Sequence, residues 1–267
     1  MERATPLSGT GPRDGGLQPA PGPRTYLSVV VPVWNGAERL PRTLWALHHM
    51  LAHHPPAELL VVDDCSDHET ARVIEAFARD APVTVLRNDR NRGKGYSVRR
   101  GMLAARGDVR VFMDADLAYP AEEVETLIDA LERGSDVAIA CRVLPESRYV
   151  MSPAFFPYLF TRHVLSRAYN AVVRAVLVDD VLDTQAGLKA FTRSAAELIF
   201  PRVTVPGFGF DVECLYIAQR HGQRLAQVPV TFRYDDEPST VNVARHGARM
   251  LADLARIRLN ARRGRYD

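Results

Sequence analysis

Two carboxylates separated by one small residue follow the apolar run VRVFM, as Asp114, Ala115 and Asp116. This spacing places both carboxylates on the same side of an extended chain end, and the small Ala115 leaves room beside them. Hard cations such as Mg²⁺ and Mn²⁺ prefer oxygen ligands of this kind. The tripeptide therefore predicts a metal site that holds a diphosphate and stabilises its charge as it leaves. The structural alternative is that Asp114 caps the turn and Asp116 is solvated.

A second acidic pair, Asp63 and Asp64, follows another apolar run and precedes Ser66 and Asp67. Asp and Ser are good helix caps, so one carboxylate of the pair is predicted to form the turn that starts the next helix. The other could accept a hydrogen bond from the imide N–H of a uracil, which requires a fixed carboxylate at a strand end.

A turn that carries glycine and positive charge, NRGKG at residues 91–95, precedes a predicted helix. Backbone N–H groups and the dipole at a helix start favour an anion there. Gly93 and Lys94 are therefore candidates for contact with a phosphate. The alternative is an ordinary loop with a solvated lysine.

The elements that must position these groups follow a repeated strand–helix–strand order. Short β-branched runs alternate with amphipathic stretches, which predicts an α/β fold with a mostly parallel sheet flanked by helices. The predicted strands are LSVVVPV, ELLVVDD, VTVLRN, VRVFMDAD and DVAIACR, with helices at about 38–51, 69–79, 96–105 and 121–131. Ligands of such sheets bind beyond the carboxyl ends of the strands, so these ends define one crevice. The polar residues at the strand ends are Asn35, Asp63, Asp64, Asn88, Asp114, Asp116 and Arg142.

Beyond Arg142 the pattern changes. Residues 153–178 predict two adjacent helical segments in which aromatic and aliphatic side chains alternate with arginine and histidine. A strand near LKAF, a helix near 211–221, a strand at LAQVPVTF and a last helix from about Thr240 follow. The last helix combines apolar residues with seven arginines. Both amphipathic parts are predicted either to lie on an anionic membrane surface or to pack against protein.

Composition bears on compartment and partners. A net charge of +2 over 267 residues gives no reason to expect nucleic-acid binding. The three cysteines lie far apart, which favours reduced thiols over disulfides or a zinc site. No window is apolar enough for a membrane span, and no signal peptide is recognisable. We therefore expect a cytoplasmic protein, with the inner face of the cell membrane as a peripheral location.

Taken in order, the segments resemble the family 2 glycosyltransferases of GT-A fold, and within them the dolichyl-phosphate or polyprenyl-phosphate glucosyltransferase and mannosyltransferase branch. The segments that carry the resemblance are VVVPVWNGAERLPRTL, LLVVDDCSD, NRGKGYSVRRGMLAARG, VFMDADLAYP, DVAIACR, LDTQAGLKAFTR and GFGFDVECLYIA. We expect a GT-A domain at 25–240, with a nucleotide-binding half at 25–142 and an acceptor half at 143–240. A basic amphipathic helix at 241–267 follows it. Residues 1–24, with almost no large apolar side chains, are predicted to be a disordered leader.

The resemblance implies a nucleotide-sugar donor, a polyprenyl phosphate acceptor, and Mg²⁺ or Mn²⁺ as cofactor with Asp114 and Asp116 as its ligands. The predicted donor-binding residues are Pro32, Trp34, Asn35, Glu38, Asp63, Asp64, Asn88, Gly93, Lys94, Asp114, Ala115 and Asp116. The resemblance also implies acceptor-binding residues in the segment RHVLSRAYN and in the loop DTQ at residues 183–185, which we call the DTQ loop. The predicted acceptor-binding residues are Arg142, Arg162, Ser166 and Gln185. The predicted catalytic residues are Asp116, Asp183 and Asp211.

The chain departs from the family pattern at three places. The segment WNGAE has Gly36 where the branch usually carries a carboxylate, which leaves the role of Glu38 open. Ala118 stands where mannosyltransferases often place a metal-binding Gln; together with LDTQAGLKAF and FDVE this favours the glucosyl branch, and UDP over GDP. The late Gly-x-Ser-Lys appears as residues 237–240, EPST, so a basic contact to the phosphates is missing there.

The sequence thus predicts an inverting transfer of a hexose, with glucose favoured, from a UDP-sugar to a polyprenyl phosphate. An ionised phosphate can attack without a strong general base. If the acceptor is a soluble hydroxyl, Asp211 would be the base, at the place where the resemblance also puts Glu213. A nucleotide-sugar-binding module without catalysis is a further alternative. The oligomeric state is not predicted.

Overall fold

The computed structural model describes residues 26–54, 56–151, 156–234 and 243–267, with the backbone alone for 156–165 and 243–248. The predicted leader at 1–24 and the EPST segment at 237–240 lie outside the described residues. The strands are β1 (Leu27–Val33), β2 (Ala57–Asp63), β3 (Thr84–Arg87), β4 (Val109–Met113), β5 (Val137–Cys141), β6 (Arg148–Met151), β7 (Leu188–Thr192), β8 (Leu225–Pro229) and β9 (Thr231–Tyr234). The helices are α1 (Leu40–Leu51), α2 (His68–Asp80), α3 (Lys94–Ala104), α4 (Glu123–Glu132), α5 (Phe156–Val176), α6 (Arg193–Ile199), α7 (Phe210–Arg220) and α8 (Val243–Arg262).

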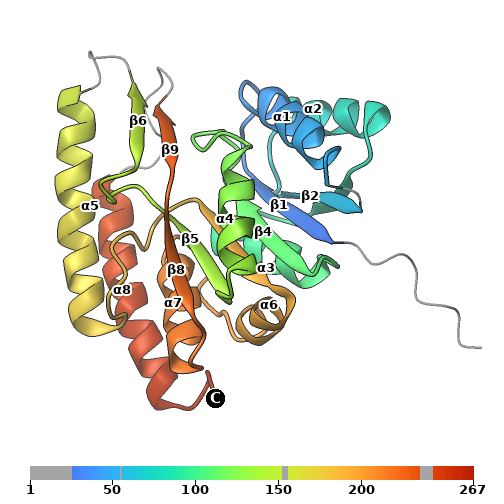
Figure 1. Ribbon diagram of the computed structural model, residues 1–267. Coiled ribbons are helices and arrows are strands. Elements are labelled where there is room, and N and C mark those ends of the chain that lie inside the picture. The colour runs from blue at the N-terminus through green and yellow to red at the C-terminus, as the bar shows by residue number, and fades with distance from the viewer. Residues whose placement is uncertain (1–25, 55, 152–155, 235–242) are drawn as a thin grey trace, which may run out of the picture.

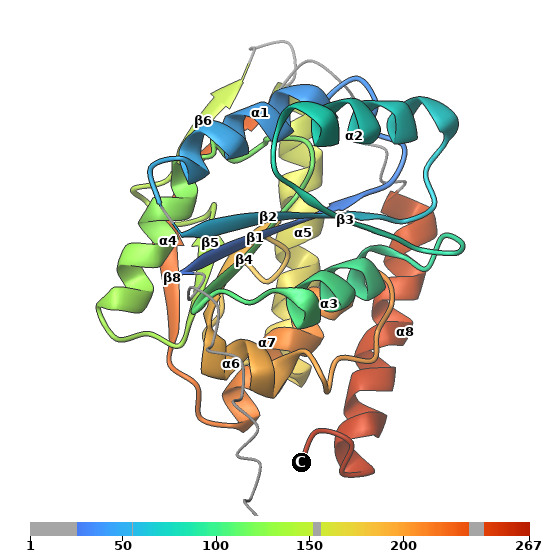
Figure 2. The same ribbon diagram turned by 90° about the vertical axis from the view of Figure 1, so that its right-hand side faces the viewer.

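Seven strands form one sheet in the order β3-β2-β1-β4-β7-β5-β8 (Figure 1). Strands β1 to β4 pair in parallel, and so do β5 and β8, whereas β7 runs antiparallel to both of its neighbours, β4 and β5. Helices α1 and α2 cover one face of the sheet, and α3, α6 and α7 lie on the other (Figure 2). The predicted α/β architecture with a mostly parallel sheet flanked by helices is confirmed.

The central strands are buried because helices cover both faces of the sheet. β1 is buried except at Pro32, and every residue of β4 and β5 is buried. Continuous apolar runs are typical of strands in this position. At the start of α2, the Asp67 carboxylate accepts a hydrogen bond from the backbone N–H of Thr70 at 2.8 Å, which is an N-cap.

Helix α3 approaches the sheet most closely at Gly101. A Cβ atom on Gly101 would lie 2.3 Å from Cγ1 of Val30 on β1 and 2.9 Å from Cγ2 of Val62 on β2. Only a residue without a side chain fits at this contact, so glycine sets the distance between α3 and the sheet. The position of α3 also fixes the turn at Gly93 and Lys94, which leads into it.

Two predicted elements differ from the structure. The two helical segments predicted over 153–178 are one helix in the described part, α5, because Pro157 suits a first turn and no later Gly or Pro interrupts the run. The single strand predicted at LAQVPVTF is two strands, β8 and β9. Pro229 has no N–H to extend a ladder, and after Val230 the chain leaves the main sheet.

Strand β9 pairs in parallel with β6 to form a two-stranded ribbon beside the main sheet (Figure 1). Neither β6 nor the short helix α6 was predicted from the sequence. The Ser147 side chain fixes the ribbon, because its hydroxyl accepts from the Val230 N–H and donates to the Cys141 carbonyl at 2.6 Å. The ribbon thereby stays attached to the carboxyl end of β5.

The two long amphipathic helices each have one side packed against protein. On α8, Leu254 and Ile257 are buried, and on α5, Val173 is buried. Arg258 of α8 donates to the carbonyl of Val176 at the end of α5 at 3.1 Å. Leucine and valine side chains remain exposed elsewhere on both helices: Val172, Val176, Leu251 and Leu259. Within the part of the chain that the structure describes, no helix is both long and apolar enough to cross a membrane.

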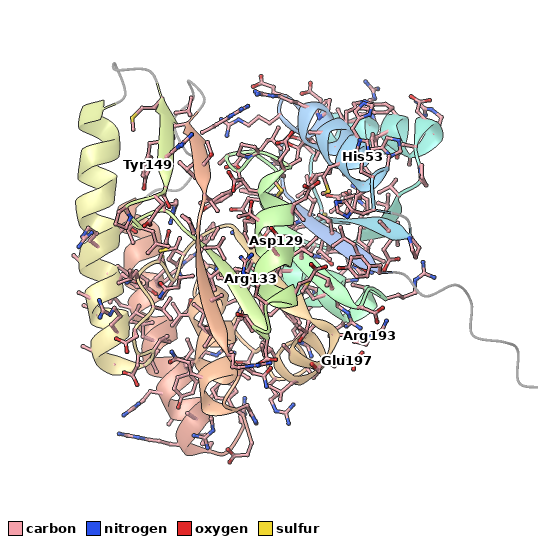
Figure 3. All side chains as sticks on the ribbon, viewed as in Figure 1. His53, Asp129, Arg133, Tyr149, Arg193 and Glu197 are labelled. Atoms are coloured by element: carbon pink, nitrogen blue, oxygen red, sulfur yellow. The ribbon has the colours of Figure 1, made fainter. Side chains whose placement is uncertain are left out.

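Around α6, by contrast, charged residues pair with each other. Arg193 lies 2.8 Å from Asp108, and Arg110 lies 2.9 Å from Glu197. Figure 3 labels Arg193 and Glu197 on α6, beside the amino ends of the central strands. In each pair the two charges neutralise each other, so we assign these residues a structural role.

We expect Gly101→Ala to lower the free energy of unfolding by about 1–3 kcal/mol, because the added methyl group overpacks the contact between α3 and the sheet. Urea denaturation followed by circular dichroism measures the change. Gly36→Ala is the control, since a Cβ there meets nothing within 4 Å. An unchanged or raised stability for Gly101→Ala would show that helix propensity, and not the close packing, dominates at this position.

Candidate active site

The antiparallel pairing of β4 with β7 brings two distant loops together. Met113, the last residue of β4, lies opposite Leu188, the first residue of β7. The turn after β4 and the DTQ loop before β7 are therefore neighbours, and the N–H of Asp114 donates to the carbonyl of Gly187 at 2.9 Å. We call residues 114–116 the acidic turn. It lies at the edge of the sheet where β1 and β2 also end.

The Asp114 carboxylate carries an ion pair with Lys94, which begins α3. The Lys94 Nζ lies 2.7 Å from Oδ1 and 3.0 Å from Oδ2, so one ammonium contacts both oxygens. The carboxylate also packs across Gly187, where a Cβ atom would lie 2.1 Å from the Asp114 Oδ2. Glycine is required at that position, and the sequence analysis did not single it out.

The third residue of the acidic turn, Asp116, is exposed, yet protein atoms surround it closely enough to limit its hydration. Partial desolvation, together with the charge of Asp114, raises the pKa of Asp116. Its Oδ1 accepts from the Ala118 N–H at 3.1 Å, and Leu117 adopts a φ of 54°. Capping of the turn therefore falls to Asp116, not to Asp114 as the structural alternative assumed. The Thr43 hydroxyl holds the turn from below by donating to the Ala115 carbonyl at 2.8 Å.

The acidic turn suits a hard divalent cation. It offers two carboxylates, and a cation, the Lys94 ammonium, already contacts one of them. Among the described residues, no group of three His, Cys, Asp or Glu side chains could enclose a metal. Mg²⁺ and similar ions are often held by one or two carboxylates while substrate phosphates and water complete the shell. The two carboxylates are suitable ligands for such a cation. That Asp114 and Asp116 bind a metal stays a prediction.

The glycine turn before α3 is occupied by one of the chain's own carboxylates. Asp64 accepts from the N–H groups of Arg92 at 2.8 Å and Gly93 at 2.7 Å, and from the Asn88 side chain at 2.6 Å. The anion found at this turn is thus Asp64, and contact of the Lys94 side chain with a donor phosphate stays a prediction. Gly93 and Asn88 as donor-binding residues stay predictions.

The other member of the acidic pair forms the predicted turn. Asp63 accepts from the Ser66 N–H at 2.8 Å and lies 3.4 Å from the Arg87 guanidinium. Asn35, after the end of β1, contacts the same turn, because its Oδ1 accepts a hydrogen bond from the Asp67 N–H at 2.9 Å. Asn35 and Cys65 both have positive φ, at 49° and 59°. Strained backbone of this kind often marks functional loops. The uracil contact stays a prediction.

The remaining predicted donor residues lie at the end of β1. Pro32 is half-buried in β1, whereas Trp34 is 58% exposed and Glu38 is exposed in the turn before α1. An indole with more than half its surface in water has room for a flat ligand to stack. Their roles in nucleoside binding stay predictions.

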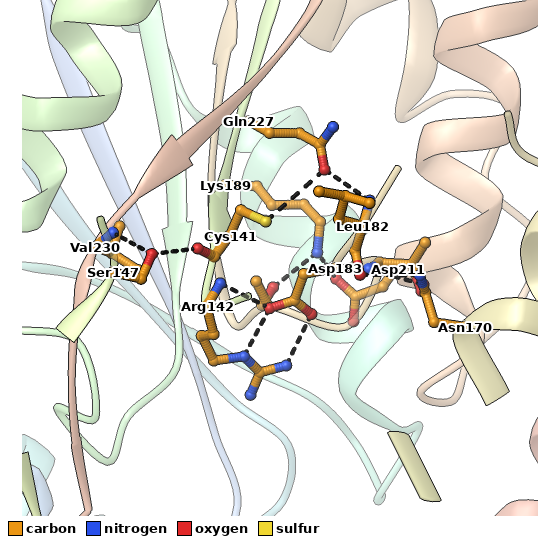
Figure 4. A network of polar contacts seen from close by, with 12 residues as sticks. Cys141, Arg142, Ser147, Asn170, Leu182, Asp183, Lys189, Asp211, Gln227 and Val230 are labelled. Atoms are coloured by element: carbon orange, nitrogen blue, oxygen red, sulfur yellow. Dashed lines mark hydrogen bonds and ion pairs between the residues drawn. The ribbon is translucent and has the colours of Figure 1, made fainter. Parts of the chain in front are cut away.

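On the acceptor side, Arg142 at the end of β5 binds Asp183 of the DTQ loop (Figure 4). Its Nε donates to Oδ2 at 2.7 Å and its Nη2 to Oδ1 at 2.9 Å. Burial would raise the pKa of Asp183, but the charge and hydrogen bonds of Arg142 outweigh it and lower that pKa. The guanidinium also stacks over the Phe232 ring at 5.4 Å. Asn170 of α5 anchors the loop by accepting from the Thr184 hydroxyl at 2.8 Å.

A second buried ion pair lies behind the acidic turn. The Lys189 Nζ on β7 donates to Asp211 Oδ1 at 2.5 Å and to the Ala186 carbonyl at 2.7 Å (Figure 4). Both side chains are almost fully buried. Burial raises the pKa of Asp211, and the Lys189 ammonium opposes that rise. The sequence analysis missed Lys189, although a lysine inside the apolar strand LKAF was a signal for a buried partner.

Glu213, named with Asp211 as a position for a base, has a structural role. It is buried, and its carboxylate accepts from Thr204 N–H at 2.8 Å, Val205 N–H at 2.7 Å and Tyr266 O–H at 2.6 Å. With its oxygens engaged in this way, Glu213 fixes the loop before α7 and is not placed to accept a substrate proton.

The other predicted acceptor residues lie on two separate segments, α5 and the DTQ loop. Ser166 is exposed on α5, and the side chain of Arg162 lies outside the described residues. Gln185 is half-buried in the DTQ loop, and its Nε2 is buried without a hydrogen-bond partner among the described residues. An unsatisfied amide in the DTQ loop is a group that a ligand or a water would complete.

Comparison with known proteins shows the family to which the chain belongs. The family model for glycosyl transferase family 2 matches residues 28–196. A dolichyl-phosphate beta-glucosyltransferase from Dictyostelium discoideum is 32% identical over 245 residues, which cover 87% of this chain and 74% of that protein. A dolichyl-phosphate beta-glucosyltransferase from Homo sapiens is 33% identical over 225 residues, covering 79% and 68%. The matched family region contains the acidic turn, the DTQ loop and β7, whereas Asp211 lies beyond it.

Among solved structures, glucosyl-3-phosphoglycerate synthase from Mycobacterium tuberculosis, in complex with Mn²⁺, UDP and glucosyl-3-phosphoglycerate, has a TM-score of 0.64. The two chains are 20% identical, and the match covers 87% of this chain and 80% of that one. The same enzyme with Mg²⁺ and UDP gives a TM-score of 0.62 at 22% identity, covering 90% and 80%. At this identity the likeness shows the fold alone, which is the GT-A fold.

We expect Asp183→Asn to lower the free energy of unfolding by about 3 kcal/mol at neutral pH, because it leaves Arg142 without its buried partner. The folded pKa of Asp183 is lowered, so its stabilisation is complete above the unfolded carboxyl pKa and is lost as pH falls through the folded pKa. The difference between wild type and variant should therefore shrink below about pH 4.

Urea denaturation at a series of pH values measures this difference. Asp136→Asn is the control, because Asp136 pairs with the largely exposed Arg224. An exposed pair should contribute less than about 1 kcal/mol. Equal losses in the two variants would contradict the special weight given to the Arg142–Asp183 pair.

Proposed function

The chain belongs to glycosyltransferase family 2, and on that premise we propose that it transfers a hexose, glucose, from a UDP-sugar to a polyprenyl phosphate with inversion at the anomeric carbon. The observation that carries the proposal is the joining of the acidic turn to the DTQ loop across β4 and β7. A phosphate-binding lysine and a cation-binding turn then lie beside the paired Arg142 and Asp183. The relatives named dolichyl-phosphate beta-glucosyltransferase support the choice of sugar and acceptor.

On the donor side, Asp114 and Asp116 would hold Mg²⁺ or Mn²⁺, which would neutralise the charge that develops on UDP as its bond to the anomeric carbon breaks. Lys94 supplies a second positive charge to the diphosphate from a backbone that Asp64 fixes. The exposed Trp34 lies at the end of β1, where a uracil would stack. We propose UDP and not GDP as the nucleotide because the chain resembles the glucosyl branch. Ala118 stands where mannosyltransferases often have a metal-binding Gln.

On the acceptor side, Arg142 retains N–H groups that Asp183 does not use, and the stacked Phe232 ring holds the guanidinium in plane. A phosphate oxygen that is already ionised forms the new bond to the anomeric carbon directly. It requires positioning, not proton removal. A phosphate acceptor therefore fits a site in which, among the described residues, Asp183 and Asp211 are both engaged in ion pairs.

Asp211 is the residue that separates this proposal from transfer to a soluble hydroxyl. It is 1% exposed and bonded to Lys189, so a hydroxyl substrate has no direct path to its oxygens. A general base must lie within hydrogen-bond reach of the proton that it removes. The burial of Asp211 supports a structural and electrostatic role, and with it the phosphate acceptor.

We expect the purified protein to release UDP and form a lipid-phosphate hexose from UDP-glucose, a polyprenyl phosphate and Mn²⁺, as detected by mass spectrometry. Asp116→Ala should abolish the product. Asp211→Asn, which keeps an oxygen facing Lys189, should lower turnover by less than about tenfold, whereas loss of a general base costs on the order of a hundredfold or more. A hundredfold loss with intact UDP binding would favour the hydroxyl acceptor. Binding of UDP-glucose without any turnover would favour a non-catalytic module.

We also propose that the protein meets its acceptor at the inner face of the cell membrane, on an anionic lipid surface. Apolar side chains remain exposed on both α5 and α8, among them Val172, Leu251 and Leu259. Arg167 on α5 and Arg249 and Arg256 on α8 are exposed as well. Exposed apolar groups flanked by arginine are the features with which amphipathic helices bind anionic lipid.

Co-sedimentation with vesicles that contain phosphatidylglycerol should show binding that weakens as salt is added. Leu251→Asn should weaken binding roughly fivefold or more, since burial of leucine in the interface is lost. Leu103→Asn on α3, at a leucine of similar exposure, should leave it unchanged. Absence of binding to anionic vesicles would count against a lipid acceptor and favour helices that only pack on protein.

A further inference from the structure

The two lysines of this chain both lie at the candidate site. Of its 34 lysine and arginine residues, only Lys94 and Lys189 are lysine. Lys94 contacts Asp114, and Lys189 contacts Asp211. Arginine holds a carboxylate with a rigid two-pronged fork, whereas the lysine ammonium is a point charge on a flexible stem that can change partners. A lysine on Asp114 is therefore suited to be a counter-ion that leaves.

The Lys94 ammonium stands where a cation would bind Asp114. Its Nζ contacts both oxygens, at 2.7 and 3.0 Å. A divalent cation ligated by Asp114 would lie about 2 Å from one of these oxygens, in contact with an ammonium of like charge. The pair and the metal complex are thus alternative states of the same carboxylate.

Only the side chain of Lys94 is free to move. The backbone on either side is held by the bond from Gly93 N–H to Asp64 and by the bond from Tyr96 N–H to the Pro206 carbonyl at 3.2 Å. A Cβ atom on Gly95 would lie 2.5 Å from the Val205 carbonyl oxygen, so this turn has no space to shift.

The Lys94 ammonium is held in its charged form beside Asp114. Burial would lower the pKa of Lys94, but the carboxylates of Asp114 and Asp211 outweigh it and raise that pKa. The rings of Phe208 and Phe210, at 5.9 and 5.7 Å, flank the ammonium on the side of α7. A lysine displaced from Asp114 therefore needs a new anionic partner, and the oxygens of a diphosphate supply one.

We propose that Lys94 is an exchangeable counter-ion that couples cation binding to nucleotide binding at the acidic turn. Without nucleotide, the ammonium occupies Asp114 and opposes the divalent cation. With a nucleoside diphosphate, the ammonium moves to phosphate oxygens and frees the carboxylate. Because linkage is reciprocal, the cation strengthens nucleotide binding by the same factor. The inference rests on the proposed use of a metal and a nucleotide sugar, and adds that one side chain couples the binding of the two.

The test measures the dissociation constant of Mn²⁺ by the electron paramagnetic resonance signal of free Mn²⁺, with and without UDP. A titration of Mn²⁺ with UDP alone corrects for the complex that forms in solution. In the wild type, UDP should tighten Mn²⁺ binding on the order of tenfold. In Lys94→Met, Mn²⁺ alone should bind more tightly than in the wild type, and the effect of UDP should fall below its wild-type value, because only the direct ligation of the cation by phosphate remains.

Two further variants separate the contact itself from the general charge of the turn. Lys94→Arg should bind Mn²⁺ more weakly than the wild type in the presence of UDP, because a guanidinium fork holds Asp114 more firmly. Arg92→Met removes a positive charge from the same turn, where the side chain pairs with Asp89 and not with Asp114. It should keep the wild-type coupling. Thermal melting of each variant confirms that it is folded.

The possible outcomes test the coupling role of Lys94 separately from the metal dependence of the proposed function. If Lys94→Met binds Mn²⁺ no more tightly than the wild type and keeps its full response to UDP, the coupling role of Lys94 is overturned. The same holds if Arg92→Met loses the coupling equally. If the wild type binds no Mn²⁺ even with UDP, the metal-dependent part of the proposed function fails, and this inference fails with it.

Discussion

The antiparallel register between β4 and β7 is the constraint on which the site depends. A parallel strand at this place would put its amino end at the opposite edge of the sheet, and the DTQ loop with it. Because β7 runs the other way, the bond from Asp114 N–H to the Gly187 carbonyl joins the acidic turn to that loop. The lack of a side chain at Gly187 then lets the Asp114 carboxylate lie across the loop. Backbone pairing and the glycine at 187 thus set the distance between the acidic turn and the DTQ loop.

Charge compensation decides what each carboxylate of the site can do. Asp64 is satisfied by backbone N–H groups, Asp183 by a two-pronged arginine and Asp211 by a buried lysine. Each of these is held by partners that do not leave without unfolding part of the site. Asp114 and Asp116 differ, since one is paired with a half-buried lysine and the other faces water. Among these carboxylates, those of the acidic turn are therefore the most available to a ligand.

The sequence predicts well those features that depend on residues close together in the chain. The apolar runs of β1 and β4, the turn at Asp63 and the start of α3 all follow from local patterns. Strand direction does not, because LKAF reads as a strand but carries no sign of running against its neighbours. The ribbon of β6 and β9 was missed for a similar reason, since four residues are too few for a periodic pattern and the pairing joins segments about 80 residues apart in the sequence.

Partners of the charged residues were the hardest part to predict, and the reason is topological. Asp63, Asp64, Asp114, Asp183 and Asp211 are the same residue type, and nothing local to any of them indicates whether it meets a backbone N–H, an arginine, a lysine or solvent. The partner of Asp64 comes from a turn 28 residues later, and that of Asp211 from a strand 22 residues earlier. The partner's type, however, is visible. Where a chain uses arginine for nearly every positive charge, a lysine marks a position at which a fixed guanidinium fork is not tolerated. In Lys94 that exception coincides with the ion pair that nucleotide binding would break under the proposed coupling.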